Sequence, residues 1–303
     1  MSPVFKAELI IDELVKRVVY ELEKLTNNFE IILIDDGSPE NCWVKITENC
    51  KKDKRIKGVK LSRNFGQHNA VLAGLVEASG DLIVIMDCDL QDDPKHIKLL
   101  VNSYYAGSQI VFTKRINRKH SFFKSFTAKI YNLIFNVFAD KEYDINVGSL
   151  VLFTSQVKYE FLKIKEHNSL YIQVLKWVGF DHSYVNVEHM PRLNGKTSYS
   201  LKGLINMAIQ GWVSNSEKLL YLSIKIGGCL ILSSLTLVIY IVYSFLNYPY
   251  QSGWASLICT IILCSGLILT SLGILGIYLG KTYNEVKNRP NYIVELKNNV
   301  GND

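Results

Sequence analysis

Two carboxylates, Asp87 and Asp89, stand one residue apart directly after the apolar run Leu82–Met86. Such a run is typical of a buried strand, and open α/β sheets bind ligands at the ends of their strands. Paired carboxylates there can share one hard divalent cation, and Mg²⁺ held in this way fills its other positions with water and substrate phosphates. The pattern predicts a metal site for a nucleotide diphosphate, although acidic pairs are also common in solvated loops.

Apolar runs of strand length alternate with helical patterns before residue 190. Alternation of this kind predicts an α/β domain with a mainly parallel sheet. We expect strands at 30–35, 57–61, 82–87, 109–113, 149–154 and 183–187, and helices at 9–26, 40–52, 66–79 and 94–106.

A long uncharged region, residues 226–280, contains no Asp, Glu, Lys, Arg or His. A helix needs roughly 20 apolar residues to cross a bilayer, and the segment 247–253 supplies a turn. We therefore predict two membrane spans, near 226–246 and 254–280.

The cations around these spans predict their orientation. Lysine and arginine flank the two spans on their outer sides, and the connecting turn has none, so the positive-inside rule places both chain ends in the cytoplasm. These cations are Lys218, Lys225, Lys281, Lys287 and Arg289. Residues 1–25 do not predict a signal peptide, and the six cysteines show no C-x-x-C or zinc spacing. The expected location is the inner cell membrane, with the catalytic domain cytoplasmic.

Two further segments have membrane-related patterns. Between Lys114 and Lys129 lie six basic residues and no acid, interleaved with phenylalanines. Such a stretch suits an anionic lipid surface or a phosphate, and a solvated helix face is the alternative. The apolar spacing over 201–213 predicts an amphipathic helix, which either lies in the membrane interface or packs beneath the catalytic domain.

In this order, the motifs of the chain resemble those of family 2 inverting glycosyltransferases of the polyprenyl-phosphate type, which includes bactoprenol glucosyltransferase and dolichol-phosphate mannose synthase. The resemblance runs nearly end to end. It rests on Pro3–Glu8, Asp35–Ser38, Leu61–Gly66, Asp87–Asp92, Arg192-x-x-Gly195-x-Thr197-x-Tyr199, and Gly276–Gly280 continuing to Arg289-Pro290.

The resemblance implies an A-type glycosyltransferase domain, a Rossmann-like α/β fold, at 1–199. It is followed by an interface helix at 200–225, two membrane helices at 226–280 and a cytoplasmic tail at 281–303. The nucleoside is expected beside Pro3, Phe5, Glu8 and Asp36, and the metal, Mg²⁺ or Mn²⁺, at Asp87, Asp89 and Gln91. For Asp36, a turn or capping role before the helix at 40 is the alternative.

The chain departs from the family pattern at Ser149, where many members carry the aspartate of Gly-Asp-Phe. A sugar hydroxyl acceptor needs a base to take its proton, whereas a phosphate monoester, with a second pKa of about 6, arrives largely ionised. Ser149 therefore fits a lipid-phosphate acceptor. Cations must then help that phosphate approach a negative donor, and Arg115, Arg118 and Lys124 are the candidates.

The start of the chain is a second departure. In this fold a hydrophobic first strand precedes the Pro-x-Phe segment, yet only Met1 and Ser2 stand before Pro3. We expect this strand to be missing, which would expose strand edges and open the nucleoside pocket. A start codon assigned too late and a truncated gene are the two explanations.

The expected activity is transfer of a sugar, with inversion, from UDP-glucose or a related UDP-sugar to undecaprenyl phosphate at the cytoplasmic membrane face. The expected partners are the nucleotide sugar, the polyprenyl phosphate and the membrane, with a homo-oligomer as an option and no nucleic acid. One alternative is a processive polysaccharide synthase, since Gln173-x-x-Lys176-Trp177 approaches the Gln-x-x-Arg-Trp motif. The other is a non-catalytic membrane scaffold that has kept the fold.

Overall fold

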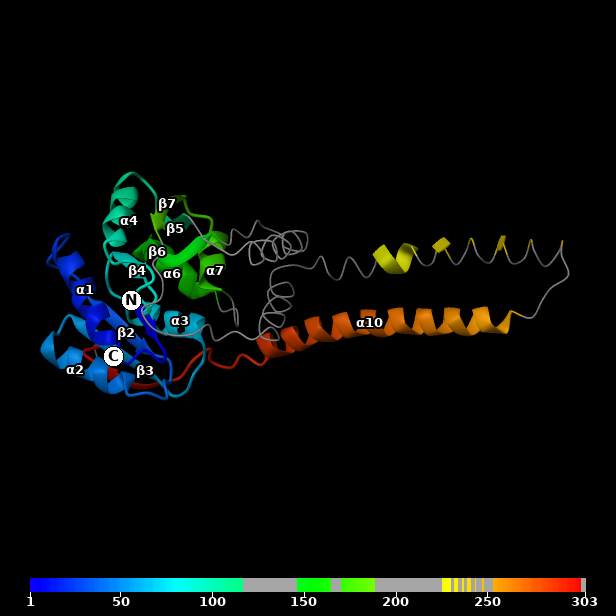
Figure 1. Cartoon of the computed structure of the whole chain (residues 1–303), viewed down its shortest axis with the longest axis horizontal. Helices are drawn as coiled ribbons and strands as arrows, with labels where there is room; N and C mark the ends of the chain where they lie inside the picture. The colour runs from blue at the N-terminus through cyan, green and yellow to red at the C-terminus, as the bar shows by residue number, and fades with distance from the viewer. Residues whose placement is uncertain are drawn as a thin grey trace. The chain divides into compact units, whose positions relative to one another are not determined.

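The computed structural model describes residues 1–116, 146–164, 170–188, 225–229 and 253–300, with isolated positions between 232 and 247. These residues fall into two compact units. The first contains the described residues up to 188 together with 289–300, and the second contains those between 225 and 288. Residues 289–300, predicted to belong to a separate tail, are thus part of the first unit (Figure 1).

The first unit is built on two four-stranded sheets. One has the order β1-β2-β3-β8 and the other the order β4-β6-β5-β7. The strands are β1 (Ser2–Val4), β2 (Ile31–Asp35), β3 (Ile56–Leu61), β4 (Leu82–Ile85), β5 (Ile110–Ile116), β6 (Val147–Thr154), β7 (His182–Glu188) and β8 (Val294–Asn298).

Met1 connects the two sheets. Its amino group donates to the Val84 carbonyl at 2.7 Å, and its own carbonyl accepts from the Met86 N–H at 3.0 Å. This pairing follows the pattern of a parallel ladder, so β1 lies between β2 and β4. The sequence led us to expect that this inner strand is missing. The structure has a short strand, Ser2–Val4, in its place.

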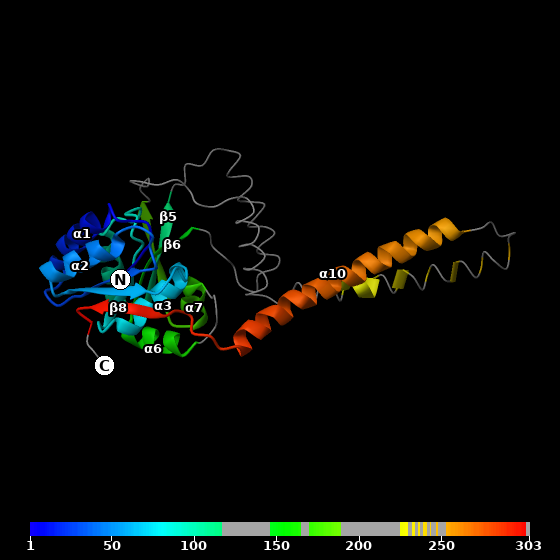
Figure 2. The same cartoon turned by 90° about the horizontal axis from the view of Figure 1, so that it is seen from below.

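The sheets are mixed rather than mainly parallel. The β1–β2, β2–β3 and β5–β7 pairs are parallel, whereas β6 pairs antiparallel with both β4 and β5. At the other edge, β8, red in Figure 2, pairs antiparallel with β3. Leu61 lies opposite Val294, and Gly58 lies opposite Asn298. The sequence predicted the positions of six strands but not these directions.

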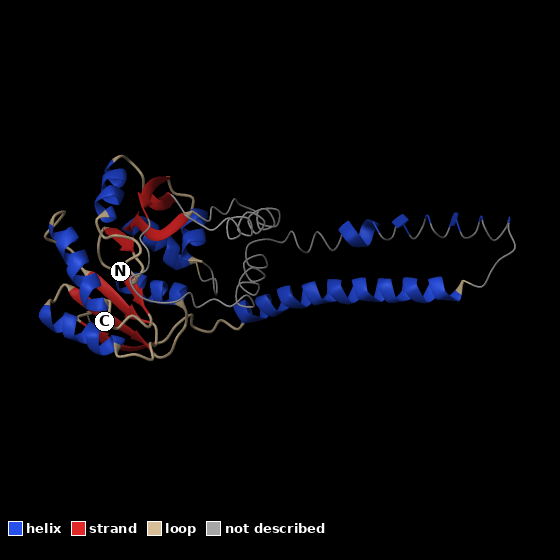
Figure 3. Cartoon of the chain, in the orientation of Figure 1, coloured by secondary structure: helices blue, strands red, loops and turns tan. Residues whose placement is uncertain are grey.

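Helices cover both faces of the sheets, with the strands between them (Figure 3). Successive strand residues point to opposite faces, so Ile32 and Ile34 contribute to one core cluster while Ile31 and Leu33 contribute to the other. One cluster contains residues of α3 (Gln67–Glu77), α6 (Ser155–Lys163) and α7 (Tyr171–Trp177), and the other contains residues of α1 (Ile11–Glu23), α2 (Cys42–Lys52) and α4 (His96–Tyr105). Strands from both sheets contribute to each cluster, so the core is shared between the sheets.

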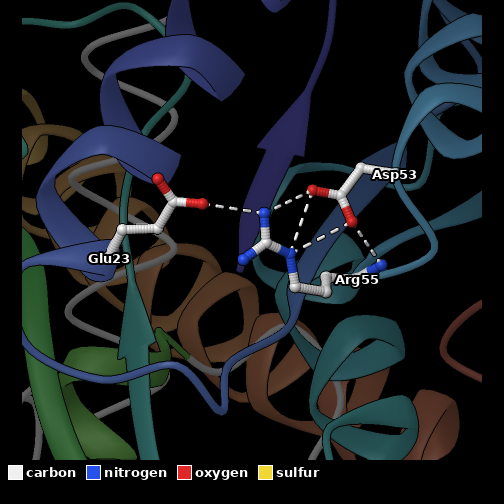
Figure 4. Close-up of polar contacts among 3 residues, drawn as sticks. All are labelled: Glu23, Asp53 and Arg55. Carbon is white, nitrogen blue, oxygen red and sulfur yellow. Dashed lines mark hydrogen bonds and ion pairs between the residues drawn. The ribbon is translucent and has the colours of Figure 1, made fainter.

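An ion-pair cluster fastens α1 to the entrance of β3 (Figure 4). The Arg55 guanidinium donates to Asp53 at 2.8 Å and to Glu23 at 2.9 Å, and it stacks 4.3 Å from the centre of the Phe29 ring. These hydrogen bonds lower the pKa of Asp53.

In the second unit, α10 (Trp254–Val286) includes the predicted second span and continues six residues past Gly280. Its segment Leu263–Val286, with a mean hydropathy of 1.9 and no buried residue, is the one stretch of the described residues that is long and apolar enough to cross a membrane. At 1.5 Å per residue the whole helix is about 50 Å long, more than the roughly 30 Å of a hydrocarbon core. The predicted first span and the 201–213 helix lie largely or entirely outside the described residues.

Gly58 of β3 packs closely against side chains of α2. A Cβ atom there would lie 2.7 Å from Ile46 Cγ2 and 3.3 Å from Trp43 Cζ3. We predict that Gly58→Ala destabilises the protein by about 1–3 kcal/mol through overpacking, measured as a lower midpoint of thermal unfolding. Gly80→Ala is the control, since its Cβ would meet no atom closer than 3.4 Å. Equal midpoints for the two variants would contradict this packing.

Candidate active site

The predicted site residues gather at one end of the sheets. Because β1, β2 and β4 run in the same direction, the chain leaves all three at the same edge, where parallel α/β sheets form ligand sites. Phe5 directly follows β1, Asp36 directly follows β2, and Asp87 follows β4 after one intervening residue, Met86. The structure therefore brings together residues that are more than 80 positions apart in the sequence.

Asp36 is held by the turn between β3 and α3, residues Arg63–Gln67, which we call the β3–α3 turn. The Asp36 carboxylate is buried, and it accepts hydrogen bonds from Phe65 N–H at 2.7 Å and Gly66 N–H at 3.0 Å. Burial raises the pKa of Asp36, and these two bonds oppose the shift. The turn also passes against Gly37, where a Cβ would lie 2.3 Å from the Arg63 carbonyl carbon.

The alternative role for Asp36, a turn or cap before the next helix, belongs to its neighbour. Asp35 Oδ1 accepts from Ser38 N–H at 2.9 Å, which closes the turn after β2. The helix α2 has Asn41 at its N-cap, without a side-chain capping bond. Asp36 is therefore directed to the β3–α3 turn and not to the helix.

The same turn reaches the first of the paired carboxylates, Asp87. Gln67 Nε2 donates to Asp87 Oδ1 at 2.5 Å, and Gln91 N–H donates to Asp89 Oδ1 at 3.1 Å. Leu90, between Asp89 and Gln91, is buried and has a φ of +55°. Residues with a Cβ rarely adopt this backbone conformation. Strained backbone of this kind clusters at functional sites, where the surrounding structure maintains it.

Asp87 has a perturbed acidity. Burial raises the pKa of Asp87 to about 6, and the carboxylates of Asp89 and Asp92 add to the shift. The Ser149 hydroxyl and the Arg115 guanidinium act in the opposite direction. A half-buried carboxylate with other acids around it is a natural place for a cation, because a cation offsets both the repulsion and the desolvation.

Asp92 is a site residue that sequence reasoning did not single out. It is only 2% exposed, and its Oδ2 accepts from Ser149 Oγ at 3.2 Å and lies 3.8 Å from Arg115 Nη2. Tyr171 Oη in turn donates to the Ser149 carbonyl at 3.0 Å. The sequence could have indicated Asp92 only through its place in the Asp87–Asp92 motif. Its contacts with Arg115 of β5 and Ser149 of β6 are formed by the tertiary fold.

The other residues predicted to border the nucleoside lie near this edge, and their side chains differ in solvent exposure. Pro3 is buried in β1 opposite Ile34, while Phe5 is 41% exposed. The Glu8 carboxylate accepts from Asn41 N–H at 3.2 Å, at the start of α2. Phe5 is therefore the most accessible of these side chains for contact with a base.

Other residues that the sequence analysis named lie away from this edge or outside the residues that the structure describes. Arg118 and Lys124, most of the basic stretch, and the Arg192–Tyr199 motif fall outside the described residues. Lys176, from the motif compared with processive synthases, has its ammonium near the rings of Phe112 and Tyr184, at 5.7 and 5.8 Å from their centres.

The donor atoms fit a hard divalent cation. No cluster of three or more His, Cys, Asp or Glu side chains of metal-binding geometry occurs within the described ranges. The protein would offer the Asp87 and Asp89 carboxylates, and Gln91 is bonded through its backbone N–H to Asp89. Few protein ligands and several positions left for phosphate and water are typical of Mg²⁺ sites.

The chain is similar in sequence to known glycosyltransferases. The profile of Glycosyl transferase family 2 matches residues 1–164. The chain is similar to the uncharacterized glycosyltransferase YkcC of Bacillus subtilis (strain 168), at 33% identity over 99% of this chain and 94% of the relative. It is also similar to the undecaprenyl-phosphate 4-deoxy-4-formamido-L-arabinose transferase of Yersinia enterocolitica, at 29% identity over 97% of this chain and 91% of the relative.

Among solved structures, one similar fold is that of glucosyl-3-phosphoglycerate synthase from Mycobacterium tuberculosis, in complex with Mn²⁺, UDP-glucose and phosphoglyceric acid. The TM-score is 0.52 at 17% sequence identity, over 70% of this chain and 76% of that chain. This likeness confirms the A-type glycosyltransferase fold expected from the sequence.

The raised pKa of Asp87 predicts how stability depends on pH. An unfolded aspartate titrates near about 3.9, so between about pH 4 and 6 the native state binds more protons and stability falls as pH rises. Asp87→Asn removes this charge and should raise the unfolding temperature of metal-free protein at pH 8, with the gain fading towards pH 4. Thermal unfolding in detergent and EDTA measures it.

Asp53→Asn is the matched control of opposite sign, because its hydrogen bonds with Arg55 lower the pKa of Asp53. This substitution should lower the unfolding temperature at pH 8 and matter less in acid. If Asp87→Asn also lowered the unfolding temperature at pH 8, the environment described for Asp87 would be wrong.

Proposed function

Since the chain belongs to glycosyl transferase family 2, we propose that it transfers a sugar, with inversion, from a nucleotide sugar to undecaprenyl phosphate or a similar polyprenyl phosphate. UDP-glucose or a related UDP-sugar is the proposed donor. The observation that carries the proposal is the junction of Asp36 and Asp87 at one sheet edge through the β3–α3 turn, with Asp89 two residues after Asp87. The Yersinia relative, named for an undecaprenyl-phosphate acceptor, supports the acceptor class.

The donor's diphosphate belongs beside Asp87 and Asp89. These carboxylates, with Gln91, would hold Mg²⁺ or Mn²⁺, which when bound neutralises charge on the departing nucleoside diphosphate. The complex of the Mycobacterium tuberculosis enzyme with Mn²⁺ and UDP-glucose supports a divalent metal. On the other side, Asp36, Phe5, Pro3 and Glu8 would border the nucleoside.

The acceptor's phosphate provides its own nucleophile. One of its ionised oxygens forms the new bond to the anomeric carbon as the bond from that carbon to the diphosphate oxygen breaks, so no base has to take a proton. The presence of serine at position 149 agrees with this mechanism, because a serine side chain has no carboxylate that could act as the base. The electron pair of the broken bond leaves with the diphosphate.

Arg115 is the proposed phosphate ligand among the described residues. Its guanidinium lies 3.8 Å from buried Asp92, and within the described part of the chain its Nε is buried without a hydrogen-bond partner. A phosphate offers oxygens that match the planar fork of an arginine. Arg118 and Lys124 are proposed to assist it from the basic stretch.

We place this reaction at the cytoplasmic face of the inner membrane. The α10 segment and the uncharged region that precedes it would form two spans, with both chain ends in the cytoplasm by the positive-inside rule. The membrane and the lipid phosphate are then the proposed partners.

Asp89→Asn should abolish transfer while leaving expression and membrane insertion unchanged, because it removes a charge linked to the leaving group. The rate should fall below about a tenth of wild type, which corresponds to roughly 1.4 kcal/mol of barrier. The initial rate with radiolabelled nucleotide sugar measures it. Asp93→Asn, in the same loop but bonded to Lys95 N–H, is the control that keeps activity. Equal rates for the two variants would refute the role of Asp89.

Arg115→Ala and Lys124→Ala should raise the KM for polyprenyl phosphate far more than the KM for the nucleotide sugar, because a phosphate loses charge-assisted bonds when its cations are removed. Steady-state rates with each substrate varied in turn separate the two constants. Arg17→Ala, which removes an exposed ion pair with Glu13, is the control. If both KM values rose equally, the basic residues would not form an acceptor site.

A further inference from the structure

The residues that follow the membrane-unit helix α10 in sequence return to the first unit as the edge strand β8, and side chains fasten this strand at its far end. Asn299 Nδ2 donates to the carbonyls of Cys50 at 2.7 Å and Ile56 at 2.9 Å, and Asn298 Nδ2 donates to Thr47 Oγ1 at 2.9 Å. These bonds make β8 an integral part of the sheet.

The near end of β8 meets the residues that hold the candidate site. Because β8 runs antiparallel to β3, its start lies at the end of β3, where Ser62 N–H donates to the Ile293 carbonyl at 2.9 Å. Ser62 directly precedes the β3–α3 turn. Tyr292, half-buried, packs against the core cluster that includes α3 and α7.

Asn291 extends this contact to the helix that leaves the turn. It lines a cavity of about 20 Å³ together with His68, Asn69 and Tyr171. The His68 and Tyr171 rings are 5.4 Å apart, and the Asn69 side chain donates to the Phe65 carbonyl at 2.9 Å. The segment Asn291–Val294 is therefore bonded to Ser62 directly before the turn, and it borders the first residues of the helix directly after the turn.

We propose that Asn291–Val294, which we call the C-terminal brace, positions the β3–α3 turn and through it Asp36 and Asp87 for binding of the nucleotide and its metal. The inference rests on the proposed function, because it assigns the brace to the donor site of that reaction. The turn has its backbone bonded to Asp36 and its Gln67 side chain bonded to Asp87. A shift of the turn would move both carboxylates at once. The Arg289-Pro290 motif leads directly into this brace.

A comparison of the two ends of the same edge segment tests the proposal. Tyr292→Ala removes the ring at the brace, and Asn298→Ala removes the bond to Thr47 at the far end. Both variants, made in the full chain purified in detergent, should lower the unfolding temperature. Only Tyr292→Ala should weaken binding of UDP with Mn²⁺ by calorimetry, by about tenfold, the low end of outer-shell effects on metal sites. Tyr292→Phe should restore the affinity, because the ring supplies the packing.

Amide hydrogen exchange provides a readout independent of ligand. The N–H groups of Phe65 and Gly66 should exchange faster in Tyr292→Ala than in Asn298→Ala. If Tyr292→Ala does not fold, Tyr292→Leu takes its place, with the same direction of change expected.

The outcomes separate the brace from the proposed function. Wild-type affinity for UDP and Mn²⁺ in the Tyr292 variant, or equal losses in both variants, would overturn the brace while leaving the donor site in place. A wild-type chain that binds no UDP in the presence of Mn²⁺ would overturn the proposed donor site, and the brace with it.

Discussion

The arrangement of this site depends on one buried carboxylate, that of Asp36, which accepts two backbone N–H groups of the β3–α3 turn. A buried charge is stable only when hydrogen bonds replace the water it has lost, so the turn has to stay where it satisfies Asp36. The turn in this position also directs Gln67 to Asp87. The hydrogen bonds of this turn therefore connect the end of β2, where we propose the nucleoside, with the end of β4, where we propose the diphosphate.

Much of the fold could be predicted from the sequence, because apolar runs of strand length mark strands that are buried on both sides, and helical periodicity marks helices that bury one face. Strands β2 to β7 and helices α1 to α4 lie close to their predicted positions. Three features could not be predicted. Strand β1 has three residues, too few for a periodic signal; β8 is a partly polar edge strand; and the antiparallel direction of β6 is set by packing between distant segments.

The residues of the candidate site likewise include some that the sequence could predict and some that it could not. Asp87 and Asp89 could be predicted because an acidic pair directly after an apolar strand has a chemical meaning that needs no tertiary information. The roles of Gln67, Asp92 and Ser149 depend on contacts between residues as far apart as 57 positions, which no local pattern encodes. Sequence motifs therefore identified the residues proposed to meet the substrate, and the structure added those that hold them in place.

Transfer of a sugar from a nucleotide to a lipid phosphate can be measured with the purified protein. The wild-type chain, purified in detergent, would be incubated with Mn²⁺ or Mg²⁺, undecaprenyl phosphate and a panel of radiolabelled nucleotide sugars. With a UDP-sugar as donor, we expect label in an organic-soluble, acid-labile product, and this labelling should depend on both the metal and the lipid phosphate. Label in a water-soluble polymer, or no transfer from any donor while the protein remains folded, would contradict it.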